Sequence, residues 1–341
     1  MNAEYTPTKA FVMKEVPRDE QFEHGVAPTD TIEVGKPTLI VFGGDMTYKP
    51  QNANYYIKRM RKILDWGDVK DVNIYAAYYF FGLHDYKGHR ATIFKAAGHK
   101  IKHSLTTKQA KEVPTPDYIQ DLFEMLFLPL IVDKEKALEN VSKVRIFAHS
   151  HGAMVARVLG DFMAAQMRKM GYAPDEIKKI QQNIVVIQHG PTTPLENPRF
   201  TTLSFGSAED IMMDMHNRFS KYAYDNSIDM YPSYFSQGGA HLFATYRLAH
   251  GVDGEHGIDG LTDTTYLTDD GKIIHAAERN AIVNSLRAAA NNQPMPTVES
   301  LVSSPGVNFQ EMKSNGEYFY DQILRDIKRL MKQNPKHANQ K

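Results

Sequence analysis

The sequence predicts a doubly wound, mostly parallel α/β sheet with a helical cap or lid insertion. Two features predict it: short apolar runs recur along the chain and end in small residues, and amphipathic segments lie between most of these runs. Continuous apolar runs are typical of strands buried on both faces of a parallel sheet, whereas half-exposed strands alternate polar and apolar residues. Strands that alternate with helices in this way form a doubly wound fold.

The predicted core strands are the apolar runs over residues 38–42, 72–81, 144–147, 184–187 and 201–205. Helices are predicted over residues 52–64 and 153–170, because apolar side chains recur there with helical spacing. Gly171 is expected to end the second helix, since glycine adopts the left-handed backbone of a helix C-terminus without strain. Two β-like pieces, residues 9–16 and 31–34, are expected as edge strands ahead of the core.

Residues 83–142 are too many for an ordinary connection between two strands, and we expect them to form a cap or lid beside the active-site edge of the sheet. This segment begins with basic residues and histidines and then becomes an apolar helix over residues 118–131, which Pro129 interrupts. The 341 residues are otherwise expected to form a single domain that ends in a frayed basic tail, residues 332–341.

Composition limits the classes of function. The chain has 40 basic and 40 acidic residues, so net charge gives no reason to expect a nucleic-acid partner. No apolar run reaches the length of a transmembrane helix, and the N-terminus lacks the charged, apolar and small-residue segments of a signal peptide. A soluble, cytoplasmic protein is therefore expected. The alternative is a protein from which a leader has been removed. The absence of cysteine excludes disulfides and thiolate metal sites.

The motif with the clearest chemistry is AHSHG, residues 148–152, which follows a predicted strand and precedes a predicted helix. A strand that turns sharply into a helix needs small residues two positions either side of a nucleophile, and Ala148 and Gly152 meet that need. The helix N-terminus then points N–H groups at the reacting centre. The pattern predicts Ser150 as a nucleophile and the backbone N–H of His151 as an oxyanion donor; a serine in an ordinary β–α turn is the alternative.

Two motifs carry a resemblance to a known family. FAHSHGA, residues 147–153, resembles the nucleophile elbow of the α/β-hydrolase family, in the variant with alanine at the first small position. LIVFGGD, residues 39–45, resembles the strand and glycine loop that supply the other oxyanion donor, which implies the backbone of Gly44 or Asp45. The resemblance covers the order of motifs over residues 38–290 and indicates no subfamily. It implies a serine esterase or lipase whose triad follows the chain order Ser, acid, His.

The family resemblance implies an acid in the loop after the strand at 201–205. Residues 206–210 resemble the family's glycine-to-aspartate turn, which makes Asp210 the implied acid. A carboxylate at this position would hold the catalytic imidazole in one tautomer and stabilise its charged form. A helix-capping role is the alternative for Asp210. Rival acids nearby are Glu209, Asp214 and Asp225.

The family places the base in a loop after the last strand, for which residues 241–248 are the best candidate. The glycine-rich loop that follows contains His256, the implied base, and His250, the alternative base. His149 and His151 flank the serine, and their adjacency argues against them, since side chains beside the nucleophile point elsewhere. The remaining alternatives are His241, His275 and the absence of a triad.

These assignments imply acyl transfer, with a small-molecule or lipid ester as substrate and with no metal or organic cofactor. A metal site within residues 241–256, with Asp253 and Glu255 as oxygen ligands, is an alternative whose spacing matches no recognised pattern. The basic stretch 87–111 is a candidate contact with anionic lipid headgroups or an acidic partner; a solvated surface explains it equally. The competing function is a non-catalytic ligand- or protein-binding module on the same fold.

Overall fold

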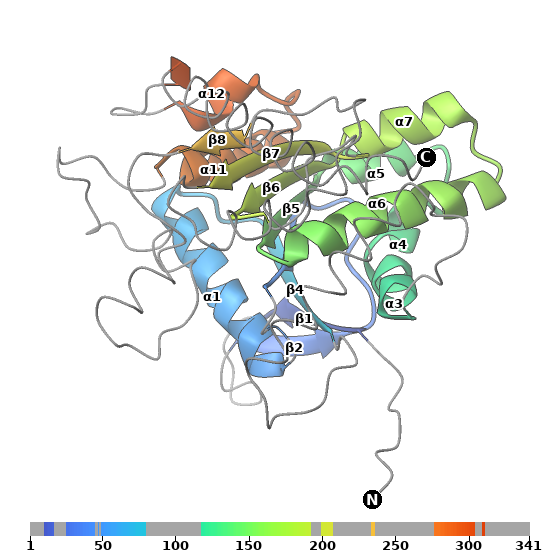
Figure 1. Ribbon diagram of the computed structural model, residues 1–341, viewed down its shortest axis with the longest axis horizontal. Coiled ribbons are helices and arrows are strands. Elements are labelled where there is room, and N and C mark those ends of the chain that lie inside the picture. Colours follow the sequence, from blue (N-terminus) through green and yellow to red (C-terminus); the bar gives the residue numbers. More distant parts are fainter. Residues whose placement is uncertain are drawn as a thin grey trace, which may run out of the picture.

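The computed structural model describes residues 10–16, 25–44, 47, 49–79, 117–191, 199–206, 233–235, 276–303 and 309–310 (Figure 1). These residues form an eight-stranded sheet in the order β2-β1-β4-β3-β5-β6-β7-β8. Its strands are β1 (Ala10–Glu15), β2 (Val26–Thr29), β3 (Thr38–Phe42), β4 (Asn73–Tyr79), β5 (Val144–His149), β6 (Val185–His189), β7 (Thr201–Gly206) and β8 (Ser233–Phe235). The pairs from β4 to β8 are parallel, and β1 is antiparallel to both β2 and β4. The mostly parallel sheet that the sequence predicts is confirmed.

Helices cover both faces of the sheet. They are α1 (Pro50–Trp66), α3 (Asp117–Leu126), α4 (Leu128–Ile131), α5 (Ala137–Ser142), α6 (Gly152–Lys169), α7 (Pro174–Gln182), α11 (Ala276–Ala290) and α12 (Val298–Val302). Alternate residues of β3 face opposite layers: Ile40 and Phe42 pack with α3 to α7, whereas Leu39 and Val41 pack with α1, α11 and α12. Burial on both faces is the physical reason for the unbroken apolar run in β3.

The five predicted core strands and the two predicted helices are confirmed with small changes at their ends. Helix α6 begins at Gly152 and ends at Lys169, so both of its ends lie one residue earlier than predicted. Gly171 follows it with φ +81°. The predicted strand over residues 9–16 is β1, but residues 31–34 are not a strand. The backbone N–H of Ile32 donates to Met125 of α3 instead of to a neighbouring strand, and the second edge strand is β2.

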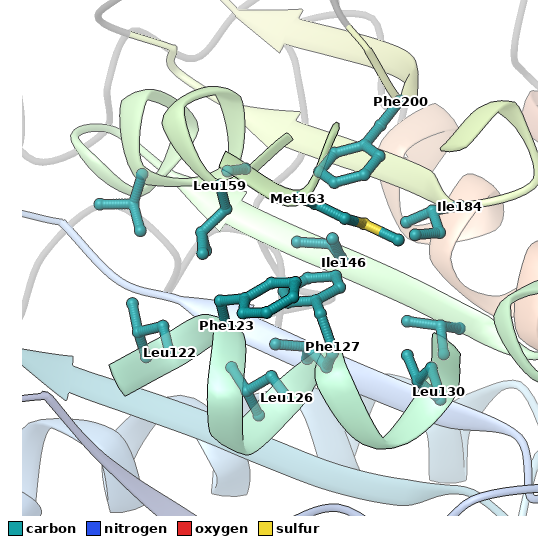
Figure 2. Close-up of a cluster of buried hydrophobic side chains, with 14 of the residues drawn as sticks. Leu122, Phe123, Leu126, Phe127, Leu130, Ile146, Leu159, Met163, Ile184 and Phe200 are labelled. Atoms are coloured by element: carbon teal, nitrogen blue, oxygen red, sulfur yellow. The ribbon is translucent and has the colours of Figure 1, made fainter. Parts of the chain in front are cut away.

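The described part of the expected cap, residues 117–142, packs against the sheet. Figure 2 shows Phe123 and Phe127 in one cluster with Ile146 of β5 and Met163 of α6. The predicted helix over 118–131 is divided into α3 and α4, because Pro129 lies in the first turn of α4, where its missing N–H is tolerated. These helices therefore supply part of the hydrophobic core. Residues 83–116 lie outside the described residues, as does the expected basic tail.

Candidate active site

Ser150 occupies a sharp turn between β5 and α6. Its φ is +51°, in the left-handed region that residues other than glycine rarely adopt. The turn is held by backbone hydrogen bonds on both sides: the N–H of Ser150 donates to the carbonyl of His189 at 2.9 Å, and its own carbonyl accepts from Ala153 at 3.1 Å. The residue retains 8% of its accessible surface. The strained turn that the sequence predicts at this position is present.

The start of α6 is pressed against the end of β3. A β-carbon on Gly152 would lie 2.1 Å from the carbonyl oxygen of Phe42 and 2.9 Å from that of Gly43, so no side chain fits there. His151, which precedes the first helical residue, is buried, and its carbonyl accepts from Met154 at 3.0 Å. The first turn of α6 therefore lies directly beyond Ser150, where its backbone N–H groups and the positive end of the helix dipole favour negative charge.

The glycine loop after β3 lies against the serine turn. A β-carbon on Gly44 would be 3.4 Å from the β-carbon of Ser150 and 3.3 Å from Nδ1 of His149. The backbone N–H of Gly44 donates to the hydroxyl of Tyr56 at 3.0 Å. Of the two candidates for the second oxyanion donor, Gly44 thus lies beside Ser150 with its N–H already hydrogen-bonded. Asp45 lies outside the described residues.

Two buried imidazoles lie side by side at this edge of the sheet. His149 ends β5 and His189 ends β6, and the two residues are paired in the parallel register, with ring centroids 5.3 Å apart. Nδ1 of His149 is 2.7 Å from the hydroxyl of Tyr56 on α1. Nδ1 of His189 is 2.9 and 3.1 Å from the two carboxylate oxygens of Glu278 on α11. All four side chains are buried, which makes each of these polar contacts costly to lose.

Helix α11, which carries Glu278, is tied to the sheet by a buried arginine. Nε of Arg145, on β5, donates to the carbonyl of Ser285 at 3.2 Å, and Nη1 donates to the carbonyls of Ser142 and Val144 at 2.8 Å. Burial lowers the pKa of Arg145 to about 10, because desolvation disfavours the charged guanidinium. The bond to Ser285 ties α11 to β5. Helices α11 and α1 share one face of the sheet, so Tyr56 and Glu278 approach the two imidazoles from two different helices.

Most of this polar cluster is absent from the site that the sequence predicts. The position of His149 beside the serine argues against it as the base, and Tyr56, His189 and Glu278 are not among the predicted site residues. The sequence did hold one signal: His189 lies two residues after the predicted strand 184–187, and His149 lies two residues after the predicted strand 144–147. The ends of neighbouring parallel strands meet at one edge of a sheet, so both imidazoles belong to the edge that carries Ser150.

The structure brings together Ser150, His151 and Gly44 among the sequence-predicted site residues. The predicted acid and bases lie outside the described residues, namely Asp210, His256 and His250, together with their rivals. The alternative metal site over 241–256 and the basic stretch 87–111 lie there too. Within the part of the chain that the structure describes, no group of three histidine or acidic side chains is arranged to hold a metal ion. No helix of that part is long and apolar enough to cross a membrane.

No model of a known protein family and no curated protein sequence matches the chain. Solved structures align with it at low identity. EstE1, a thermophilic carboxylesterase cloned from a metagenomic library, is 12% identical, and the alignment covers 86% of this chain and 92% of that chain with a TM-score of 0.37. Esterase B from Lactobacillus rhamnosis is 12% identical over 84% of this chain and 88% of its own, with a TM-score of 0.30. A Pyrobaculum calidifontis esterase is 12% identical over 78% and 79%, also with a TM-score of 0.30.

Proposed function

We propose that the chain is a serine hydrolase that cleaves a carboxylic ester through an acyl-enzyme on Ser150. The observation that carries the proposal is the left-handed backbone of Ser150, φ +51°, at the turn from a central parallel strand into a helix. Strain of this kind persists only where the surrounding structure enforces it, and it is concentrated at functional sites. An ordinary β–α turn has no need to hold a serine in this conformation.

The surroundings of Ser150 suit the charge that acyl transfer generates. Attack of the serine oxygen on an ester carbonyl places negative charge on the carbonyl oxygen, next to the N-terminus of α6. We assign the backbone N–H of His151 as one oxyanion donor. For the second we favour Asp45 over Gly44, because the N–H of Gly44 donates to Tyr56.

The proton transfers require a base that the family resemblance assigns to His256, with His250 as the alternative, oriented by Asp210. The imidazole takes the proton of Ser150 as its oxygen bonds to the acyl carbon, and gives that proton to the alcohol that leaves. Water then attacks the acyl-enzyme, loses a proton to the imidazole, and releases the carboxylic acid as the proton returns to Ser150. The proposed substrates are small-molecule or lipid esters. Within the expected cap or lid, residues 83–142, we propose residues 87–111 as a contact with anionic lipid surfaces.

A fluorophosphonate probe tests the nucleophile. We expect the wild-type protein to gain one phosphonyl group, located on the Ser150 peptide by mass spectrometry, and the Ser150→Ala variant to gain none. Ser303→Ala is the matched control, because Ser303 is an exposed serine outside the site, and it should label like the wild type. Absence of labelling in the folded wild-type protein would reject the hydrolase and leave a ligand- or protein-binding module.

Ester hydrolysis tests the base. His256→Ala is expected to lower kcat for p-nitrophenyl esters by about 10³-fold or more, whereas His250→Ala is expected to keep most of the wild-type activity. The reverse result would transfer the role of base to His250. Comparison of short and long acyl chains would distinguish an esterase from a lipase.

A further inference from the structure

The loop that follows β3 is held by three tyrosine and threonine contacts next to Ser150. Tyr79 donates its hydroxyl to the carbonyl of Gly43 at 2.8 Å, and the N–H of Thr47 donates to the carbonyl of Gly44 at 3.0 Å. The N–H of Gly44 donates to the hydroxyl of Tyr56 at 3.0 Å. Both glycines of the loop are therefore fixed through their backbone groups.

The ring of Tyr56 also lies close to the loop. A β-carbon on Gly43 would be 2.4 Å from Cε2 of Tyr56, so the absence of a side chain at residue 43 is what lets the ring approach. Tyr56 is buried on α1 and packs in the hydrophobic layer that α1, α11 and α12 form. The ring is thus anchored in the packing of a 17-residue helix, and its hydroxyl reaches the loop from that helix.

The Tyr56 hydroxyl contacts both Gly44 and His149, and the direction of the first hydrogen bond constrains the direction of the second. A backbone N–H only donates, so the Tyr56 oxygen is the acceptor from Gly44. Its own proton can then be given to Nδ1 of His149 at 2.7 Å, with the proton of that imidazole on Nε2. His149 immediately precedes Ser150, so one hydroxyl joins the glycine loop to the strand that carries the serine.

We propose that Tyr56 is a positioning residue for the reaction at Ser150. Its hydroxyl, held between Gly44 and His149, sets the distance between the glycine loop and the serine turn where the oxyanion would form. This inference rests on the proposed function. Donors in an oxyanion site act only when they are fixed before the charge develops, and a displacement of about 1 Å can lower the rate about 10²-fold.

Tyr56→Phe tests the proposal, because it removes only the hydroxyl oxygen and retains the packed ring. We expect kcat for p-nitrophenyl acetate to fall about tenfold or more, with KM changed less than about threefold, and labelling by the fluorophosphonate to slow by the same factor as kcat. Hydrogen exchange at the Gly44 amide should become faster, since the N–H loses its acceptor.

Tyr75→Phe is the matched control. Tyr75 is a buried tyrosine on β4 whose hydroxyl also accepts a backbone N–H, that of Glu33, at 2.9 Å, away from Ser150. A purely structural role of the Tyr56 hydroxyl predicts that the two variants lose melting temperature alike and both keep kcat. If Tyr56→Phe keeps the wild-type kcat, the positioning role is rejected while the hydrolase stands.

A second pair of variants keeps the test informative if Tyr56→Phe does not fold. His149→Asn retains a side-chain acceptor close to the position of Nδ1, and His149→Leu removes it. We expect Asn to keep kcat within about threefold of the wild type and Leu to lose about tenfold or more. Equal activities of the Asn and Leu variants would overturn the proposal. Absence of both labelling and hydrolysis in the wild-type protein would reject the hydrolase, and the positioning role with it.

Discussion

Gly152 and Phe42 approach so closely that a single methyl group would separate β3 from the start of α6. The neighbour that an added β-carbon would meet at 2.1 Å is a backbone carbonyl, which cannot rotate away as a side chain does. We expect Gly152→Ala to lower the free energy of unfolding by about 3 kcal/mol and to abolish fluorophosphonate labelling, because the serine turn must shift. Denaturant unfolding and labelling measure the two effects.

Gly35→Ala is the control for this substitution. Gly35 has φ +86° but no atom within 4 Å of an added β-carbon, so only backbone strain of about 1–2 kcal/mol is expected. Labelling should persist in Gly35→Ala. Wild-type stability and labelling in Gly152→Ala would show that the two elements can separate, contrary to the packing described above.

Substitution of Phe127 tests whether the described part of the expected cap, residues 117–142, unfolds together with the core. Its side chain is fully buried and stacks on Phe200, with centroids 6.0 Å apart (Figure 2). Phe127→Ala is expected to lower the free energy of unfolding by about 3–5 kcal/mol in a single cooperative transition. Val132→Ala, at a residue 63% exposed in the same segment, should change it by less than about 0.5 kcal/mol. Unchanged global unfolding in Phe127→Ala would indicate a cap that opens independently.

The contact between His189 and Glu278 joins β6 to α11 across 89 residues of sequence. Removal of one partner leaves a buried polar group without the other, so Glu278→Ala is expected to lower the free energy of unfolding by about 3 kcal/mol or more. In a double-mutant cycle with His189→Ala we expect a coupling energy of about 1–3 kcal/mol. Glu135→Ala, which removes an exposed carboxylate, is the control and should have little effect. Strict additivity of the two substitutions would contradict the coupling.

The ion pairs of Glu33, at the edge of the sheet, predict that the protein loses a small part of its stability in acid. Hydrogen bonds from Lys14 and then Lys36 lower the pKa of Glu33 from 4.5 to about 2. Because the pKa is lower in the folded state, the stabilisation is complete above about pH 4.5 and is lost as the pH falls toward 2. The Glu33 side chain is 43% exposed, so solvent screening limits the stabilisation to less than about 1 kcal/mol.

A comparison of wild type with Glu33→Gln across the pH range measures this effect. The difference in the free energy of unfolding should be constant from pH 7 to about 5 and should shrink between about 4.5 and 2. Glu135→Gln, at an exposed carboxylate, should show no such dependence. A difference that grows as the pH falls would contradict the sign of the shift.

Much of the fold follows from local sequence, because the signals are local. The unbroken apolar run of β3 indicates a strand that is buried on both faces. In the AHSHG turn, residue 152 must be a glycine because the start of the helix lies against a neighbouring strand. Local sequence failed to predict the structure in two places. Residues 31–34 look like a strand, but the N–H of Ile32 donates to α3. Strand β8 has only three residues, too few to stand out from its surroundings. The predicted acid and bases, Asp210, His256 and His250, stay predictions.

The parallel core and the position of the strained serine follow from local sequence, since periodicity, small residues and turn chemistry act within a few residues of one another. The side chains that meet near that serine are brought together by tertiary packing. Tyr56 and His149 are 93 residues apart, and His189 and Glu278 are 89 apart. No sequence periodicity links such distant positions. They meet because α1 and α11 pack on the same face of the sheet. Burial there makes each polar contact between these helices and the strand ends costly to lose.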